Sequence, residues 1–218
     1  MSYKGVLFDL DGTLLNTLED LGTSLNHVLE DEGYPTHSME AYRQFVGDGV
    51  EKLVVRALPQ DKRNSEVVHK CLEAYKKEYG CHWNIKTKPY QGIEELLNEL
   101  TIRKIKMAVL SNKPHKYTMM CVSELLPNWS FDPILGQRQM VPRKPDPTGA
   151  LEIATRLDIS PNECIFLGDT DVDIKTARAA GMFPVAALWG FRSEHELHES
   201  GAKALIQSPV DLLKIIDR

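Results

Sequence analysis

Short, uninterrupted apolar runs constrain the fold of this chain more than any other feature of its sequence. Residues 6–8, 107–110, 164–167 and 184–188 are such runs, and residues 204–206 form a weaker one. Runs of this kind are typical of strands that are buried on both faces, as they are in parallel sheets. The chain is therefore expected to contain a parallel sheet.

Helical patterns lie between these runs. The residues that follow Pro147 at helical spacing are all apolar: Ala150, Leu151, Ala154 and Leu157. Residues 174–180 form another helical stretch that Gly181 would end, because glycine readily adopts the left-handed backbone that closes a helix. Strands that alternate with helices predict an α/β fold, a doubly wound parallel sheet of the Rossmann-like kind.

The first two strands of this pattern are separated by almost a hundred residues without a convincing strand, far more than one crossover helix requires. Helical patterns occur there instead. The first presents Leu18, Leu21, Leu25 and Val28 on one face, and later patterns cover residues 51–58 and 67–79. We expect a helical cap domain at residues 16–86, inserted into a core formed by residues 1–15 and 87–218.

Charge and hydropathy argue against some classes of partner. The net charge is −5, whereas nucleic-acid binding needs clustered Lys and Arg. Asp9 interrupts the apolar start of the chain, where a signal peptide would need a longer apolar run, and residues 182–190 are too few to span a membrane. We expect a cytoplasmic protein, monomer or homodimer, without a nucleic-acid or membrane partner.

Polar clusters follow the predicted strands or begin a helix. They cover residues 9–13, 111–113, 143–147 and 168–173. Ligands bind at the carboxyl ends of the strands in open parallel sheets. Taken singly, each cluster has a plain structural explanation, such as a turn, a helix cap or a solvated loop. Their recurrence at successive strand ends favours a functional site.

Carboxylates dominate this predicted site. Asp9 and Asp11 are two residues apart, and Asp169 and Asp173 belong to the last cluster. Crowded carboxylates repel one another unless a cation joins them, and oxygen ligands suit Mg²⁺. Lys144 adds a fixed positive charge. Acids, a divalent ion, a lysine and turn amides are together what phosphoryl transfer requires.

The four clusters resemble those of the haloacid dehalogenase-like hydrolases, in the subclass with a helical cap after the first motif. They are Asp-Leu-Asp-Gly-Thr at 9–13, Leu-Ser-Asn-Lys-Pro at 110–114, Arg-Lys-Pro-Asp-Pro at 143–147 and Gly-Asp-Thr-Asp-Val-Asp at 168–173. Within the family they are most similar to phosphoglycolate phosphatases, as is Phe-Val-Gly-Asp-Gly at 45–49. The resemblance extends over essentially the whole chain.

The resemblance implies a role for each matched residue. Asp9 would attack phosphorus to form an aspartyl-phosphate, and Asp11 would protonate the leaving alkoxide and then activate water. Phosphoryl oxygens would be held by Ser111, Asn112 and Lys144, with Thr13 supporting the turn and contacting phosphate. The Mg²⁺ ligands would be Asp9, Asp169 and the main-chain carbonyl of Asp11, with Asp173 outside them orienting waters or Lys144.

Other functions compete with a phosphatase. Dehalogenases and phosphonate hydrolases of the family typically lack the second aspartate of the first motif, so Asp11 argues against both. A sugar-phosphate mutase of the β-phosphoglucomutase type keeps both aspartates and stays an alternative, as does a pyrophosphatase. A non-catalytic sensor of a phosphorylated ligand would usually have lost a nucleophile or a metal ligand.

The substrate is expected to be a small phosphorylated metabolite. In this cap class the inserted domain closes over the core, so residues that face the cleft should set specificity. Arg43, Lys52 and Arg56 lie near Gly47-Asp48-Gly49. We predict that Arg43 or Lys52 binds an anionic group of a substrate such as phosphoglycolate; the alternative is a solvent-facing charge on a helix.

Overall fold

The structure is a computed structural model, which describes residues 3–217. The chain divides into two compact units. One runs up to Leu15 and resumes at Pro89, and the other is Asn16–Lys88. Each unit has its own secondary structure. Within residues 3–217, no helix has the length and the hydropathy that crossing a membrane would require.

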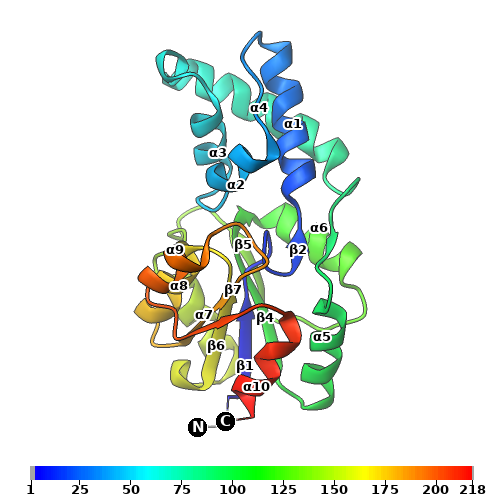
Figure 1. The fold of residues 1–218 in the computed structure, drawn as a ribbon, viewed down its shortest axis with the longest axis vertical. Helices are drawn as coiled ribbons and strands as arrows, with labels where there is room; N and C mark the ends of the chain where they lie inside the picture. The colour runs from blue at the N-terminus through cyan, green and yellow to red at the C-terminus, as the bar shows by residue number, and fades with distance from the viewer. Residues whose placement is uncertain (1–2, 218) are drawn as a thin grey trace. The chain divides into compact units, whose positions relative to one another are not determined.

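The first unit is built on a parallel sheet of six strands (Figure 1). Its spatial order is β5, β4, β1, β6, β7, β8. The strands are β1 (Gly5–Phe8), β4 (Lys106–Pro114), β5 (Ile134–Gln137), β6 (Cys164–Gly168), β7 (Phe183–Ala187) and β8 (Ala204–Ile206). The predicted doubly wound α/β fold is confirmed. Because β4 lies on one side of β1 and β6 on the other, the strand order changes direction at β1, which is where such folds bind ligands.

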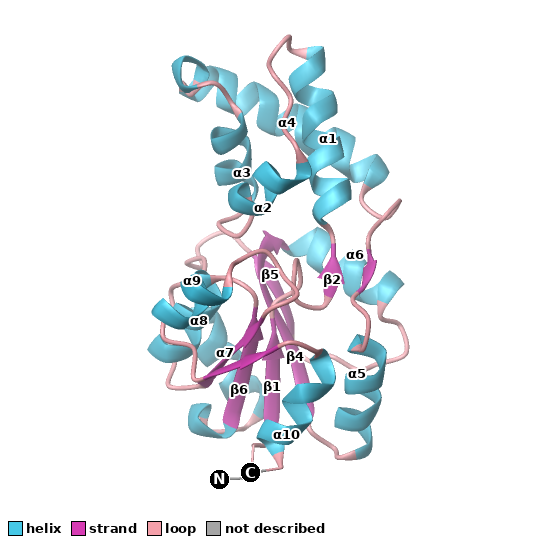
Figure 2. Ribbon diagram, viewed as in Figure 1, coloured by secondary structure: helices cyan, strands magenta, loops and turns pink. Residues whose placement is uncertain are grey.

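Helices cover both faces of this sheet (Figure 2). They are α5 (Ile93–Ile102), α6 (His115–Leu125), α7 (Thr148–Leu157), α8 (Asp171–Ala179), α9 (Glu194–Glu199) and α10 (Leu213–Ile216). Helices α7 and α8 share one apolar core with Leu7 and Phe166 from the sheet. The neighbours Val6 and Phe8 are also fully buried. Since successive side chains point to opposite faces of a strand, β1 must be apolar throughout, which explains its continuous run.

The second unit is helical, with α1 (Leu18–Asp31), α2 (Met39–Phe45), α3 (Val50–Ala57) and α4 (Ser65–His82). Two helix starts are capped by side chains: Ser38 accepts a hydrogen bond from Ala41 N, and Asn64 accepts one from Val67 N. The chain enters and leaves this unit through β2 (Leu15–Asn16) and β3 (Lys88–Pro89), which pair as a two-stranded sheet.

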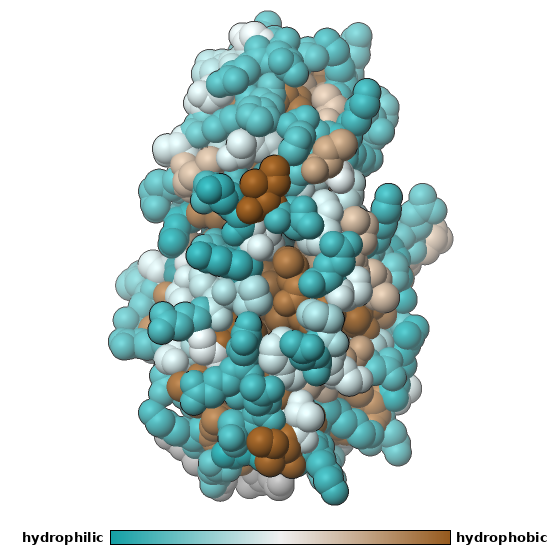
Figure 3. Space-filling view, turned by 90° about the vertical axis from the view of Figure 1, so that its right-hand side faces the viewer, coloured by the Kyte–Doolittle hydropathy of each residue, from teal (hydrophilic) through white to brown (hydrophobic). Residues whose placement is uncertain are grey.

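A buried carboxylate fastens the exit of this unit. Asp20 lies in the first turn of α1 and accepts hydrogen bonds from Lys86 N, Thr87 N and Thr87 Oγ1. Its three donors satisfy a charge that would otherwise be costly to bury. The surface in Figure 3 is mainly hydrophilic, and its apolar residues occur in small separate groups.

Candidate active site

Asp9 stands directly after β1 at the centre of the sheet. Its main-chain N–H donates to Leu167 O, so the parallel pairing with β6 continues for one residue beyond the strand. Its side chain is buried. The chain then turns at Gly12, whose φ of 87° is in the left-handed region. A side chain at this position would also meet the carboxylate of Asp169, because a Cβ placed there would lie 2.2 Å from its Oδ2.

Asp169 follows the neighbouring strand β6 and is fully buried. Each of its carboxylate oxygens is fixed by one donor. Oδ1 accepts a hydrogen bond from Thr13 Oγ1 at 2.8 Å, and Oδ2 accepts one from Phe191 N at 2.9 Å. The loops after β1 and β7 therefore hold this carboxylate in one orientation.

Asp173 lies in the first turn of α8 and takes part in the cap of that helix. Its Oδ2 accepts hydrogen bonds from Thr170 N and Thr170 Oγ1, at 3.0 and 2.7 Å. Its Oδ1 accepts one from Lys144 Nζ at 2.6 Å. Both oxygens are thus occupied by the protein, which suits a residue that orients its neighbours.

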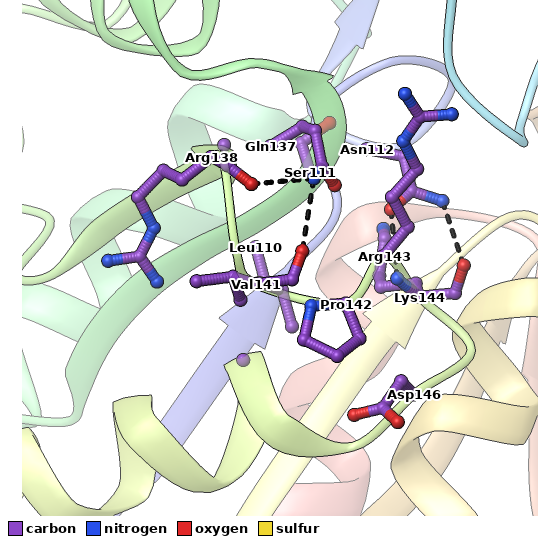
Figure 4. Close-up of a pocket in the computed structure, with 12 residues that line it drawn as sticks. Leu110, Ser111, Asn112, Gln137, Arg138, Val141, Pro142, Arg143, Lys144 and Asp146 are labelled. Carbon is purple, nitrogen blue, oxygen red and sulfur yellow. Dashed lines mark hydrogen bonds between the residues drawn. The ribbon is translucent and has the colours of Figure 1, made fainter.

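Lys144 brings a buried positive charge between two of these acids. Besides its bond to Asp173, its ammonium lies 2.9 Å from Asp9 Oδ1 in an ion pair. The main chain of Lys144 is held by Asn112, whose Oδ1 accepts from Lys144 N at 2.9 Å and whose Nδ2 donates to Lys144 O at 3.1 Å (Figure 4). Asn112 therefore fixes the residue that faces Asp9.

Asp11 faces a different lysine. Lys113 Nζ lies 2.9 Å from Asp11 Oδ1 and 3.3 Å from Oδ2, and the lysine side chain is only 3% exposed. Lys113 comes from the end of β4, next to Ser111, whose Oγ accepts a hydrogen bond from Lys113 N. The four aspartates of the site are thus accompanied by two buried lysines, one beside Asp9 and Asp173 and the other beside Asp11.

The electrostatics of the site favour a cation. Burial, followed by the charge of Asp173, raises the pKa of Asp9 to about 7, even though Lys144 opposes the shift. Burial and Asp173 also raise the pKa of Asp169 well above its usual range. Burial alone would lower the pKa of Lys144, but Asp173 and Asp9 raise it instead, so this lysine stays charged. Asp9 and Asp169 resist ionisation because they are buried beside other carboxylates, without enough positive charge to compensate.

A divalent ion would supply that charge. Asp9, Asp169 and Asp173 each offer a carboxylate oxygen, and these oxygens lie within 4.8 Å of one another. If all four aspartates are ionised, the two buried lysines leave a formal charge of −2. A cluster of oxygen donors with this charge fits a hard divalent cation such as Mg²⁺. Asp173 accepts three hydrogen bonds, one of them from the Lys144 ammonium, whereas each Asp169 oxygen accepts only one, from a neutral donor. Asp9 and Asp169 are therefore better suited as direct ligands.

The structure brings most of the predicted residues together at one end of the sheet. Asp9, Lys144, Asn112 and Asp173 are joined by ion pairs and hydrogen bonds. Asp169, which accepts a hydrogen bond from Thr13, has a carboxylate oxygen within 4.8 Å of one from Asp9 and one from Asp173. Ser111 lines a pocket with Arg138, Val141 and Arg143 (Figure 4).

The predicted specificity residues belong to the second unit. Arg43, on α2, is paired with Glu40 at 3.7 Å, and Lys52 is an exposed residue of α3. Arg56 donates to Phe45 O and to the Asp48 carboxylate, so it stabilises the loop at residues 45–49. Recognition of an anionic substrate group by Arg43 or Lys52 stays a prediction.

Sequence reasoning missed three contributors to the site. Lys113 belongs to the polar cluster at residues 111–113, but its pairing with Asp11 was not predicted. The loop after β7 was given no role, yet Phe191 N binds Asp169 and Trp189 Nε1 donates to Thr13 O at 3.0 Å. The one available signal was position, since this loop also follows the carboxyl end of a predicted strand.

Comparison with known proteins identifies the family. The sequence profile of haloacid dehalogenase-like hydrolases matches residues 6–187. The chain belongs to this family of hydrolases, and the predicted resemblance is confirmed.

Two curated relatives match the chain over nearly their whole length. The phosphoglycolate phosphatase of Nitrosospira multiformis is 30% identical over 220 residues, which cover 99% of this chain and 96% of the relative. That of Aquifex aeolicus is 32% identical over 212 residues, with 97% and 96% covered. These relatives are phosphoric monoester hydrolases, the class of enzyme that the sequence predicted.

Solved structures agree with the fold. A protein of Lactobacillus delbrueckii subsp. bulgaricus superimposes with a TM-score of 0.93 at 34% identity, covering 99% of each chain. One of Haemophilus somnus gives a TM-score of 0.91 at 26% identity, with 99% of this chain and 98% of the other covered. Both are described as predicted phosphoglycolate phosphatases.

Proposed function

We propose that the protein is a divalent-metal-dependent phosphatase that hydrolyses a small phosphate monoester through an aspartyl-phosphate on Asp9. One observation carries the proposal: the buried Asp9 carboxylate at the central strand end, with Lys144 at 2.9 Å and the Asp169 carboxylate within 4.8 Å. A carboxylate so placed can act as a nucleophile toward a phosphoryl group that the surrounding cations hold.

In the first half of the reaction, an Asp9 oxygen attacks phosphorus and the ester P–O bond breaks. Asp11 gives a proton to the leaving alkoxide, which departs as an alcohol. In the second half, Asp11 takes a proton from a water molecule as that water attacks phosphorus. The bond between Asp9 and phosphorus breaks, and inorganic phosphate leaves. The enzyme returns to its starting protonation state.

The remaining polar residues would hold the phosphoryl group and the metal. Lys144 and Ser111 would bind phosphoryl oxygens, and Asn112 would keep Lys144 in place through its two main-chain bonds. Mg²⁺ would be bound by Asp9, Asp169 and the main-chain carbonyl of Asp11. When bound, the ion neutralises the carboxylates and the phosphoryl oxygens and so lowers the electrostatic barrier to attack.

Phosphoglycolate is the substrate that the relatives favour, since two proteins named phosphoglycolate phosphatase match the chain at 30% and 32% identity. We expect the helical unit to act as a cap, with Arg43 or Lys52 binding the substrate carboxylate. The loop between these two residues, 45–49, is held by the hydrogen bonds of Arg56 to Phe45 and Asp48.

A screen of phosphate release tests the proposal. It would cover phosphoglycolate, sugar phosphates, nucleotides and pyrophosphate, with magnesium and after chelation. We expect magnesium-dependent release that is fastest with phosphoglycolate and absent in Asp9→Asn. Isomerised sugar phosphate without free phosphate would instead indicate a mutase, and full activity of Asp9→Asn would refute the nucleophile.

A further inference from the structure

The Asp11 carboxylate depends on a single side chain for its orientation. Within residues 3–217, its only polar partner is the ammonium of Lys113, at 2.9 Å from Oδ1 and 3.3 Å from Oδ2. The main chain of Asp11 is fixed separately by a bridge to Leu15. The direction of the carboxylate is therefore set by the lysine and not by the turn.

Lys113 is itself firmly placed. Its N–H donates to Ser111 Oγ at 3.2 Å, and its carbonyl accepts a hydrogen bond from Thr118 Oγ1 at 3.1 Å. The first bond lies within β4, and the second joins the end of β4 to α6. The lysine side chain is 3% exposed and that of Asp11 is 13% exposed. The main chain of Lys113 is fixed and its side chain is buried, so its ammonium can hold the Asp11 carboxylate in one orientation.

The pair would not be expected in a core selected for stability alone. Taking an ammonium and a carboxylate out of water carries a penalty that their attraction only partly offsets, and an apolar pair of similar volume is often as stable. The site already has a lysine for the phosphoryl group, because Lys144 is bound to Asp173 and paired with Asp9. The second lysine is ion-paired with Asp11, 2.9 Å from its Oδ1, so it is placed to serve that acid.

We propose that Lys113 is a positioning residue for proton transfer by Asp11. It fixes the Asp11 carboxylate at the mouth of the site so that the acid reaches the leaving oxygen and later the attacking water. This inference rests on the proposed function, in which Asp11 is the acid and base. It predicts that loss of Lys113 impairs only those steps in which Asp11 moves a proton.

The dependence on the leaving group isolates those steps. A phosphate ester of an alcohol needs a proton on its departing oxygen, whereas p-nitrophenolate leaves without one. Formation of the aspartyl-phosphate therefore needs Asp11 with phosphoglycolate but not with p-nitrophenyl phosphate. Breakdown of the aspartyl-phosphate needs Asp11 with both substrates, because water is the nucleophile in each case.

The experiment compares Lys113→Met with the wild-type enzyme on these two substrates. We expect kcat/KM for phosphoglycolate to fall by about 10²-fold or more, the usual contribution of a positioned acid. For p-nitrophenyl phosphate, kcat/KM should change by less than about fivefold, while kcat falls and a burst of nitrophenolate appears, because the phosphorylated enzyme accumulates. Equal losses of kcat/KM on the two substrates, or no loss, would overturn the proposal.

Three further variants complete the design. Asp11→Asn should show the same contrast between substrates; if it does not, the proposed role of Asp11 fails and not merely that of Lys113. Lys113→Arg keeps the charge and should recover part of the phosphoglycolate activity. Lys116→Met removes an exposed lysine three residues away and should leave both substrates unaffected. If Lys113→Met does not fold, Lys113→Gln takes its place, with the same contrast expected and the same equal losses contradicting the proposal.

Discussion

The ammonium of Lys144 lies 2.6 Å from Asp173 Oδ1, and both side chains are almost completely buried. The same ammonium lies 2.9 Å from Asp9 Oδ1. Lys144 therefore connects the predicted nucleophile to an acid that caps α8. We expect it to contribute both to the stability of the fold and to the activity of the site.

Lys144→Met should damage both. The variant leaves Asp173 and Asp9 without their cation, and breaking a buried pair from one side costs about 3–5 kcal/mol of unfolding free energy. Phosphatase activity should fall by at least about 10²-fold, because the variant loses the positive charge that would stabilise the phosphoryl group during its transfer. Urea unfolding and phosphate release measure the two effects. The double variant Lys144→Met/Asp173→Asn should recover part of the stability and none of the activity; recovery of activity would contradict this role of Lys144.

The raised pKa of Asp9 predicts an unusual pH dependence of stability in the metal-free protein. Its pKa is about 7 in the folded state, against 3.8 for the exposed group. Between these values the folded chain holds a proton that the unfolded chain has released, so the unfolding free energy falls as the pH rises from about 4 to about 7. For a shift of this size the loss is on the order of 4 kcal/mol.

Asp9→Asn lacks this titration. After chelation of metal, wild-type protein should lose stability relative to Asp9→Asn between pH 5 and pH 8, as measured by urea unfolding. Adding magnesium at pH 8 should raise the stability of the wild type more than that of the variant. If the difference in unfolding free energy between the wild type and Asp9→Asn stays constant with pH, the pKa of Asp9 is not raised in the folded protein.

Gly190 is expected to matter through its lack of a side chain. A Cβ at this position would lie 2.2 Å from Asp169 Cβ, so Gly190→Ala must displace the predicted metal ligand. Magnesium affinity should fall by about 10–100-fold, as when the support of a ligand is lost. Gly181→Ala is the matched control: no atom lies within 4 Å of its added Cβ, although its φ of 73° strains the chain. It should lower stability and leave magnesium affinity unchanged.

Trp189 should couple the loop after β7 to the first turn of the site. Trp189→Phe removes the hydrogen bond to Thr13 O and should reduce stability by about 1 kcal/mol. Because Thr13 also donates to Asp169, activity should fall several-fold. Trp129→Phe loses a comparable bond to Asn98 away from the site and should keep full activity. Equal activity in the two variants would contradict the coupling.

Much of the fold could be predicted because the central strands are buried on both faces, so that β1 and β6 appear in the sequence as unbroken apolar runs. The edge strand β5 was missed, since it contains only two apolar residues, followed by Gly136 and Gln137. Helix α2 was missed as well. Its only fully buried residue is Tyr42, which leaves no apolar stripe to recognise.

The site could be predicted as far as strand order fixes it. Asp9 and Asp169 follow β1 and β6, and Ser111 lies in the last part of the neighbouring strand β4. The carboxyl ends of these parallel strands must meet at one edge of the sheet. Which lysine pairs with which aspartate could not be predicted, because it depends on side-chain conformation. Two lysines lie near the aspartates, and the sequence does not show that Lys113 pairs with Asp11. The main-chain N–H of Phe191 leaves no trace in the sequence, because any residue could supply it.

The most direct test of the account is to trap the phosphorylated enzyme. Asp11→Asn should form the aspartyl-phosphate from p-nitrophenyl phosphate and break it down slowly, so rapid acid quenching followed by mass spectrometry should find one phosphoryl group on Asp9. The double variant Asp9→Asn/Asp11→Asn should carry none. A phosphoryl group on another residue, or a burst of nitrophenolate without a phosphorylated protein, would contradict the proposed mechanism.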